Sequence, residues 1–144
     1  MASTYTSNSG IEQPGSGEQA GAWGSTVNRN FDILDRITGG VGEITLSGTT
    51  HTLTTTDGQL SEGHYKVLIL GGTPSGANTI TISPNDQQKL FFVQNNSGQN
   101  AIFSQGGGAN ATVNNGESAI IYADGKGTGA AVAAVSYTHL RAHE

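Results

Sequence analysis

The chain has 144 residues, enough for one domain of ordinary size, and a formal net charge of −5. Only 12% of the residues are charged, about half the usual share of roughly 25%, and the six Lys and Arg are scattered, which argues against a nucleic-acid partner. The absence of Cys excludes disulfides and thiolate metal sites, and because no apolar run has membrane-spanning length and the first 20 residues lack signal-peptide features, we expect no membrane insertion.

Residues 1–22 are small and polar, with several Gly and one Pro. Their apolar residues recur with neither the 3.6-residue period of a helix nor the two-residue period of a strand. The sequence therefore predicts a flexible N-terminal arm that contributes no core element.

Residues 23–40 change to a helical pattern. At 100° per residue, one stripe holds Val27, Phe31, Leu34 and Thr38, and Ile33 and Ile37 widen it. Ser25 or Thr26 is suited to cap the start, and Gly39–Gly40 to end the helix. A helix of about 13 residues is about 20 Å long and marginal alone in water. Its wide apolar arc must therefore be covered by something else.

Asn30 lies inside this apolar arc, and two roles are open for it. An Asn in such a seam fixes the register between identical helices at some cost in stability. Alternatively, its amide bonds to a loop of the domain that follows. The sequence alone does not separate the two.

From residue 41 to residue 134 the sequence is typical of β structure. About eight or nine short β-branched or alternating runs follow one another, most of them closed by Gly, Asn, Asp or Pro. This spacing favours an antiparallel β-sandwich or a barrel-like domain, so the fold class is mainly β with one short α-helix. The expected core is Leu68, Leu70, Ile80, Ile82, Phe91, Val93, Ile102, Ile120 and Tyr122.

Two kinds of strand are expected within this region. The runs "ITLSG", "TITIS" and "ATVNN" alternate between apolar and polar residues, which predicts one face in water. The runs "YKVLIL" and "LFFV" are nearly continuous in apolar residues. They are expected to be buried on both faces.

The last ten residues, 135–144, break the preceding composition abruptly with "VSYTHLRAHE". They are similar, residue by residue, to the translation of a transposon-end sequencing adaptor, GTC TCT TAT ACA CAT CTC CGA GCC CAC GAG. We expect this segment to be adaptor-derived and the natural reading frame to have been cut near Ala133. His139 and His143, spaced like a helical metal pair, then carry no functional weight.

No catalytic or cofactor-binding constellation can be assembled from the remaining residues. His51 and His64 are thirteen residues apart, without a further His at metal-ligand spacing. The candidate carboxylates for glycoside hydrolysis all fall at or near expected loops: Asp57, Glu62, Asp86, Glu117 and Asp124. We therefore expect no enzyme, no cofactor and no metal.

One stretch resembles a known family. Residues 11–40, and the closing "IIYADG" at 120–125, resemble bacteriophage tail-fibre-like virion proteins common in marine phages. The matching positions of the first stretch are Gly17, Glu18, Gln19, Gly21, Trp23, Gly24, Asn28, Asn30 and Phe31. The resemblance implies a structural component of the phage tail, made in the host cytoplasm and located in the virion. It also implies a homotrimer whose N-terminal part docks to other tail or baseplate proteins.

Trp23, the only Trp of the chain, gives a physical reason for such docking. Gly21 and Gly24 let the backbone bend around it, so that its ring can anchor in a pocket of the β domain, a neighbouring subunit or the tail. The alternative is a staple that holds the arm onto the helix within one chain. The predicted attachment and oligomerisation residues are Trp23, Val27, Asn30, Phe31 and Leu34.

Two other functions compete with this structural role. A receptor- or glycan-binding module, which would make a host surface receptor a partner, would use exposed aromatic rings such as Tyr65 or Tyr122 as stacking platforms. Tyr122 lies in a strongly apolar run and is expected in the core, which gives this reading little support. A polysaccharide-degrading enzyme is disfavoured by the lack of a recognisable carboxylate pair.

The adaptor interpretation makes a first prediction. Deleting residues 135–144 should leave folding intact, because these residues did not evolve with the domain. Thermal unfolding measures this directly. A loss of several degrees in melting temperature, which for a domain of this size means roughly 1 kcal/mol or more, would show that part of the segment packs.

Overall fold

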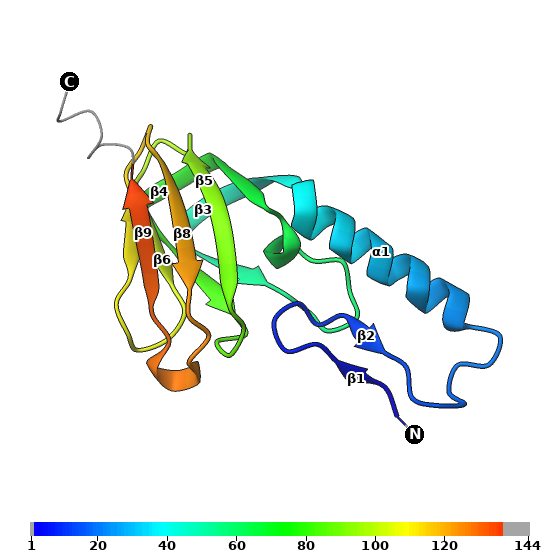
Figure 1. Cartoon of the computed structure of the whole chain (residues 1–144). Coiled ribbons are helices and arrows are strands. Elements are labelled where there is room, and N and C mark those ends of the chain that lie inside the picture. Colours follow the sequence, from blue (N-terminus) through cyan, green and yellow to red (C-terminus); the bar gives the residue numbers. More distant parts are fainter. Residues whose placement is uncertain (1, 137–144) are drawn as a thin grey trace.

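A computed structural model describes residues 2–136 of the chain. One α-helix and one curled β-sheet make up most of it, with a small hairpin beside the helix (Figure 1). The strands are β1 (Thr4–Tyr5), β2 (Glu12–Gln13), β3 (Val41–Thr54), β4 (Val67–Ser83), β5 (Lys89–Asn95), β6 (Ala101–Ser104), β7 (Ala111–Val113), β8 (Ser118–Ala123) and β9 (Val132–Ser136). The helix α1 spans Trp23–Gly39, and short 3₁₀ turns, η1 and η2, span Glu62–His64 and Gly127–Gly129.

The large sheet has seven strands in the order β7-β6-β4-β5-β8-β9, with β3 paired to β4. The strands at the two ends of this order, β7 and β9, lie close together, so that the sheet curls into a nearly closed barrel. This confirms the expectation of a mainly β, barrel-like domain with one short helix. There are fewer strands than expected because the first four predicted runs form two long strands, β3 and β4.

The direction of pairing differs from the antiparallel expectation in half of the sheet. β4 pairs in parallel with β3, β5 and β6, whereas the pairs β5–β8, β6–β7 and β8–β9 are antiparallel. Parallel pairs need connections that cross back to the same end of the sheet, and β4 is not folded into a hairpin at its Gly and Pro residues. Gly72 takes a φ of +89°, close against the backbone of Leu46, and the strand bends and continues. Its first half meets β5 and its second half meets β6.

The core lies on the inner face of the curled sheet. Six of the nine expected core residues are buried there: Leu68, Leu70, Ile80, Ile82, Phe91 and Val93. The prediction was wrong for the other three, Ile102, Ile120 and Tyr122. They lie on the outer face, and Tyr122 is 52% exposed. Their neighbours Phe103 and Ile121 are fully buried instead. In "AIFS" and "AIIYA" both alternating sets are apolar, so the pattern could not tell which set points inward.

The expectation of burial on both faces was also wrong for "LFFV". Phe91 and Val93 are in the core, but Leu90 and Phe92 on the other face are 47% and 40% exposed. The alternating runs behave as predicted, because in β7 Ala111 and Val113 are buried and Thr112 between them is exposed. An apolar outer face is therefore a particular property of β5 and its neighbours.

The helix begins two residues before the expected cap. Ala22 precedes it and offers no side-chain hydrogen bond, and Thr26 instead bonds to the side chain of Gln19. At the other end the amide of Gly40 donates to the carbonyl of Arg36 over 2.8 Å. A Cβ at Gly40 would lie 2.5 Å from that same oxygen, so glycine is needed where the chain leaves the helix for β3.

The N-terminal arm is not devoid of structure as the sequence suggested. β1 and β2 form an antiparallel hairpin, and its turn is docked on the β domain. Lys89 donates from Nζ to the carbonyl of Asn8 over 2.9 Å, and the buried His64 donates from Nε2 to the carbonyl of Ser9 over 2.7 Å. Gly10, with a φ of +61°, comes so close to Asp57 that a Cβ there would lie 2.6 Å from its carboxylate.

The predicted adaptor segment overlaps the last strand. Val135 and Ser136 belong to β9 and pair with Ile120 and Ala119 of β8. Residues 137–144, including His139 and His143, lie outside the described residues. A deletion that starts at residue 137 therefore serves as the matched control for the longer deletion proposed above, because it keeps the whole of β9.

The buried imidazole of His64 predicts a pH-dependent stability. Burial lowers the pKa of His64, the hydrogen bond to Ser9 raises it by less, and nearby Lys89 and Arg36 lower it further. The unfolded chain then binds a proton more readily than the folded chain at pH values below about 6.5, so the free energy of unfolding should fall as the pH drops through this range.

Urea unfolding at pH 7.5 and at pH 5 measures the effect. The loss of stability on acidification should be smaller in His64→Gln, which does not titrate, than in the unmodified chain. Equal losses in the two proteins would mean that His64 is not the group responsible.

Candidate attachment surface

The helix α1 is fastened to the rest of the chain along one side only. Ile33 is fully buried and Thr26 is 6% exposed on that side. Nearer the C-terminal end, the guanidinium of Arg36 lies 4.2 Å from the ring centroid of Tyr65 and donates to the carbonyl of Ser61 over 3.1 Å. Tyr65 in turn fills the space above Gly42, where a Cβ would come within 2.2 Å of its ring.

Asn30 completes this attachment through the hairpin. Its side-chain amide donates to the carbonyl of Glu12 over 2.9 Å, and its side-chain oxygen accepts from the amide of Glu12 over 3.2 Å. Of the two roles left open for Asn30, the structure favours a bond within its own chain, although the partner is β2 of the arm and not a loop of the β domain. Both polar groups of Asn30 are therefore in use in one chain.

The part of α1 that adjoins this attached side is apolar and uncovered. Trp23 and Phe31 are each 62% exposed and Leu34 is 45% exposed. Val27 lies between them and is half-buried. We call these four residues the helix stripe. Burying a large apolar side chain contributes about 1.5–3 kcal/mol to the stability of a fold. The exposed rings of the helix stripe do not make that full contribution within their own chain.

The exposure of Trp23 bears on the two roles expected for its side chain. One role is an anchor in a pocket, and the other is a staple that holds the arm to the helix inside one chain. With 62% of its surface exposed it does neither within this chain. The contacts that hold the arm to the helix are instead hydrogen bonds between polar residues, namely Gln19, Glu12 and Asn30. Most of the surface of Trp23 is therefore free of contact with its own chain.

A second apolar surface lies on the outer face of the sheet, and the sequence analysis missed it. One row of cross-strand neighbours joins five strands: Val41 of β3, Val67 of β4, Phe92 of β5, Ile120 of β8 and Val135 of β9. Leu90 and Tyr122, also paired, lie beside this row. We call these seven residues the sheet surface; Val135 belongs to the segment expected to be adaptor-derived, so the surface of the natural domain consists of the other six. Five of the seven, Val41, Leu90, Phe92, Tyr122 and Val135, are between 40% and 65% exposed.

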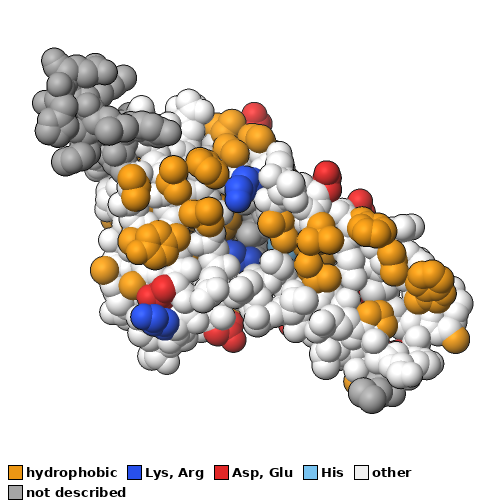
Figure 2. All heavy atoms as spheres, in the orientation of Figure 1, with side chains coloured by type: hydrophobic (Ala, Val, Ile, Leu, Met, Phe, Trp, Pro, Cys, Tyr) orange, Lys and Arg blue, Asp and Glu red, His pale blue; other side chains and the backbone are white. Residues whose placement is uncertain are grey.

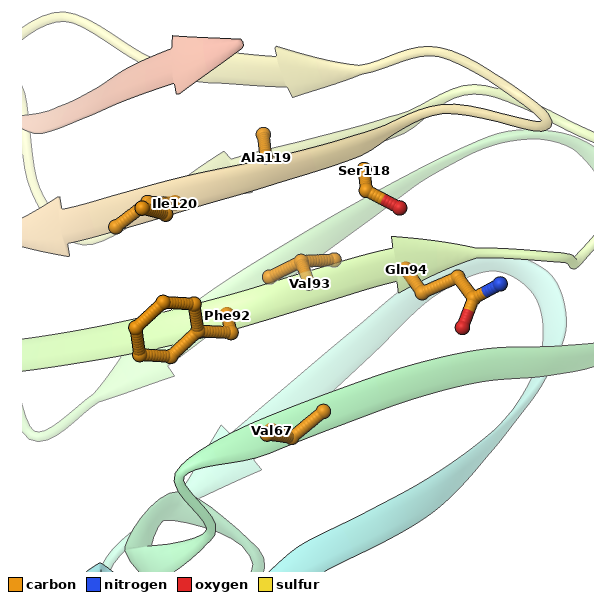
Figure 3. Close-up of a pocket in the computed structure, with 7 residues that line it drawn as sticks. All are labelled: Val67, Phe92, Val93, Gln94, Ser118, Ala119 and Ile120. Atoms are coloured by element: carbon orange, nitrogen blue, oxygen red, sulfur yellow. The ribbon is translucent and has the colours of Figure 1, made fainter. Parts of the chain in front are cut away.

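The two apolar surfaces are visible from the same side of the molecule. Figure 2 shows hydrophobic side chains along α1 and over β5, β8 and β9 in a single view. A shallow hollow lies in the sheet surface, lined by Val67, Phe92 and Ile120, with Gln94 and Ser118 at one end (Figure 3). Val41, which follows α1 after only one intervening residue, links the helix stripe to this sheet surface along the chain.

Three of the candidate catalytic and metal-binding residues, His51, Glu62 and Asp124, have contacts within the chain. His51 lies 3.0 Å from Glu62, and Asp124 accepts from the amide of Ala131 over 2.9 Å in a turn. Within residues 2–136, no group of three His, Asp or Glu side chains is arranged to hold a metal ion. In the same part of the chain, no helix is long and apolar enough to cross a membrane.

Comparison with known proteins gives no match. No protein-family model, no curated protein and no solved structure matches the chain. The observations that bear on function are therefore the two apolar surfaces and the sequence motif around Trp23.

The Asn30 contact leads to a prediction about the arm. Asn30→Ala removes both hydrogen bonds to Glu12, so the unfolding free energy should fall by about 1–2 kcal/mol, and the amides of β2 should exchange faster with deuterium. The matched control is Asn28→Ala, because Asn28 is exposed on the same helix and its loss should cost less than about 0.5 kcal/mol. Equal effects of the two variants would contradict the assigned role of Asn30.

Proposed function

We propose that this protein is a non-enzymatic structural component of a phage tail. In this proposal it acts by binding alone, associates with copies of itself as a homotrimer, and attaches to other tail or baseplate proteins through α1. The observation that carries the proposal is the helix stripe, in which Trp23, Phe31 and Leu34 are exposed on the only α-helix of the described residues.

The binding role is supported by the way in which the stripe is presented. Interfaces are enriched in Trp, Tyr and Phe at their centres, and such residues carry most of the binding energy. α1 is held against its own chain by Ile33, Asn30 and Arg36, so the adjoining stripe is fixed in position before a partner arrives. A preformed surface loses less conformational entropy on binding.

The phage-tail setting is supported by the motif around Trp23, whose residues have identifiable structural roles. Gly17 and Gly21 take φ values of +75° and +81°, which glycine adopts without strain. Gln19 bonds to the side chains of Thr26 and Glu12, and Asn30 bonds to the backbone of Glu12. The motif thus builds the bend that leads into α1 and the contacts that orient it, and it leaves Trp23 at the exposed end.

A second candidate function is the binding of a host glycan. It is favoured by one observation, namely that Tyr122 is 52% exposed and not in the core. Its ring borders a hollow that is also lined by Lys89, Asp124 and Lys126, which offer polar groups beside an aromatic platform. Binding on a glycan array that is lost in Tyr122→Ala would favour this function over a purely structural one.

Trp23 provides a test of the structural proposal because it is the only Trp of the chain. Its fluorescence should be that of a water-exposed indole at the lowest concentrations and should shift to the blue as the chains associate. Trp23→Ala should weaken a contact worth about 2 kcal/mol or more at a buried hot spot, and should keep the circular dichroism of the β domain, whose core begins beyond residue 42.

The control variants separate the helix stripe from helix stability. Leu34→Gln should abolish the concentration-dependent shift, whereas Asp32→Asn, on the far side of α1 at an exposed position, should keep it. An unchanged emission maximum over the whole concentration range, in a protein that still attaches to tails, would refute the role given to Trp23.

A further inference from the structure

The outer face of the large sheet is divided into two halves of different composition. In the half formed by β6, β7 and the second parts of β3 and β4, cross-strand neighbours are mostly hydroxyl residues. One row there joins Thr50, Thr79, Ile102 and Thr112, and another joins Thr52, Thr81 and Ser104. This is the composition of a face in water. The other half is the sheet surface, where the same alternation places valine, phenylalanine, isoleucine, leucine and tyrosine.

The strands under the sheet surface therefore have two apolar faces but bury only one of them. In β5, Phe91 and Val93 fill the core while Leu90 and Phe92 are 47% and 40% exposed. In β8, Ile121 is fully buried and Tyr122 is 52% exposed. Strands that are apolar on both faces are normally covered on both. The second cover is missing from the described part of the chain.

The amount of exposed apolar surface is that of an interface. At about 150–250 Å² for a large side chain, the helix stripe and the sheet surface together leave on the order of 800 Å² of apolar surface in water. A stable protein–protein interface buries about 800 Å² on each partner. Each surface alone lies within the range of about 300–600 Å² that the largest apolar patch on a typical monomer covers, and only the two together reach the size of an interface. Charged side chains, which interface centres avoid, border the sheet surface: Lys66 lies 5.8 Å from the ring centroid of Phe92, and Lys89, Asp124 and Lys126 lie beside Tyr122.

The position of the sheet surface indicates which molecule covers it. It is seen from the same side as the helix stripe, and Val41 follows α1 almost directly. When copies of a chain associate around one rotation axis, equivalent parts of every copy lie at the same level along that axis. If the helix stripes of several copies face a common axis, their sheet surfaces, which lie on the same side of the molecule, come to one common level along that axis.

We propose that the sheet surface is a second self-association surface, which packs against the sheet surface of a neighbouring copy of this chain around the axis shared with α1. The inference rests on the proposed function, since it takes the helix stripe as the first contact between copies. In a ring each copy offers different sides of the surface to its two neighbours. Val41, on the β3 side, then comes close to Tyr122, on the β8 side of the next copy.

Cysteine cross-linking tests this arrangement, because the chain contains no Cys of its own. Val41→Cys and Tyr122→Cys are made as separate proteins, mixed at low concentration, concentrated so that copies exchange, and treated with a short bis-maleimide. Both positions are exposed, and circular dichroism checks that each variant is folded. Thr112→Cys, exposed on the threonine half of the sheet, replaces Tyr122→Cys in the matched control.

The expected result is a covalent dimer from the Val41→Cys and Tyr122→Cys mixture in several-fold excess over the control mixture. Leu34→Cys alone reports separately on the helix stripe. Dimers from Leu34→Cys, with no excess for the sheet pair over the control, would overturn the sheet interface and leave the proposed function standing. No cross-linking from either surface would overturn both, since the apolar faces would then belong to a different partner.

Discussion

The rotation of α1 about its own axis is the constraint on which the rest of the structure depends. Either the helix stripe or Ile33 could face the body of the protein, depending on how α1 is rotated about its axis. Polar contacts hold the helix in the orientation that buries Ile33. The two hydrogen bonds between Asn30 and Glu12, and the stacking of Arg36 on Tyr65, hold one side inward. The contacts of Ile33, Asn30 and Arg36 cover one part of the helix surface, and the adjoining part with Trp23, Phe31 and Leu34 is left outward.

The hairpin connects this orientation to the sheet. Its turn is held by His64 and Lys89 of the β domain, and its second strand is held by Asn30 of the helix. Burial lowers the pKa of Lys89 to about 8, so a desolvated amine is part of that attachment. A chain with 12% charged residues thus uses a few partly buried charges and amides to place its elements. Besides the large apolar side chains of its core, it exposes others on two surfaces that are visible from the same side of the molecule.

The sequence was sufficient for the fold class, the single helix and most of the core, because hydrophobic period is a local property. It failed where the decision was not local. In "AIIYA", which of the two alternating sets of residues points into the core depends on the face over which the barrel closes. The continuation of β4 past Gly72 depends on the close approach of that glycine to the backbone of Leu46. The arm looked unstructured because its contacts are backbone carbonyls at Asn8 and Ser9, which no side-chain pattern records. The stripe residues were found because a helical period identifies them. Of the sheet surface, Ile120 and Tyr122 were expected in the core, and Val67, Leu90 and Phe92 fell in runs expected to be buried on both faces.

We propose that one chain leaves its apolar surfaces open because copies of the chain close them. Light scattering of the unmodified protein, measured from about one to about one hundred micromolar, tests this proposal. We expect a mass of three times the 14.7 kDa of the chain at the upper concentrations, with dissociation on dilution. A mass that stays at that of one chain throughout would contradict it.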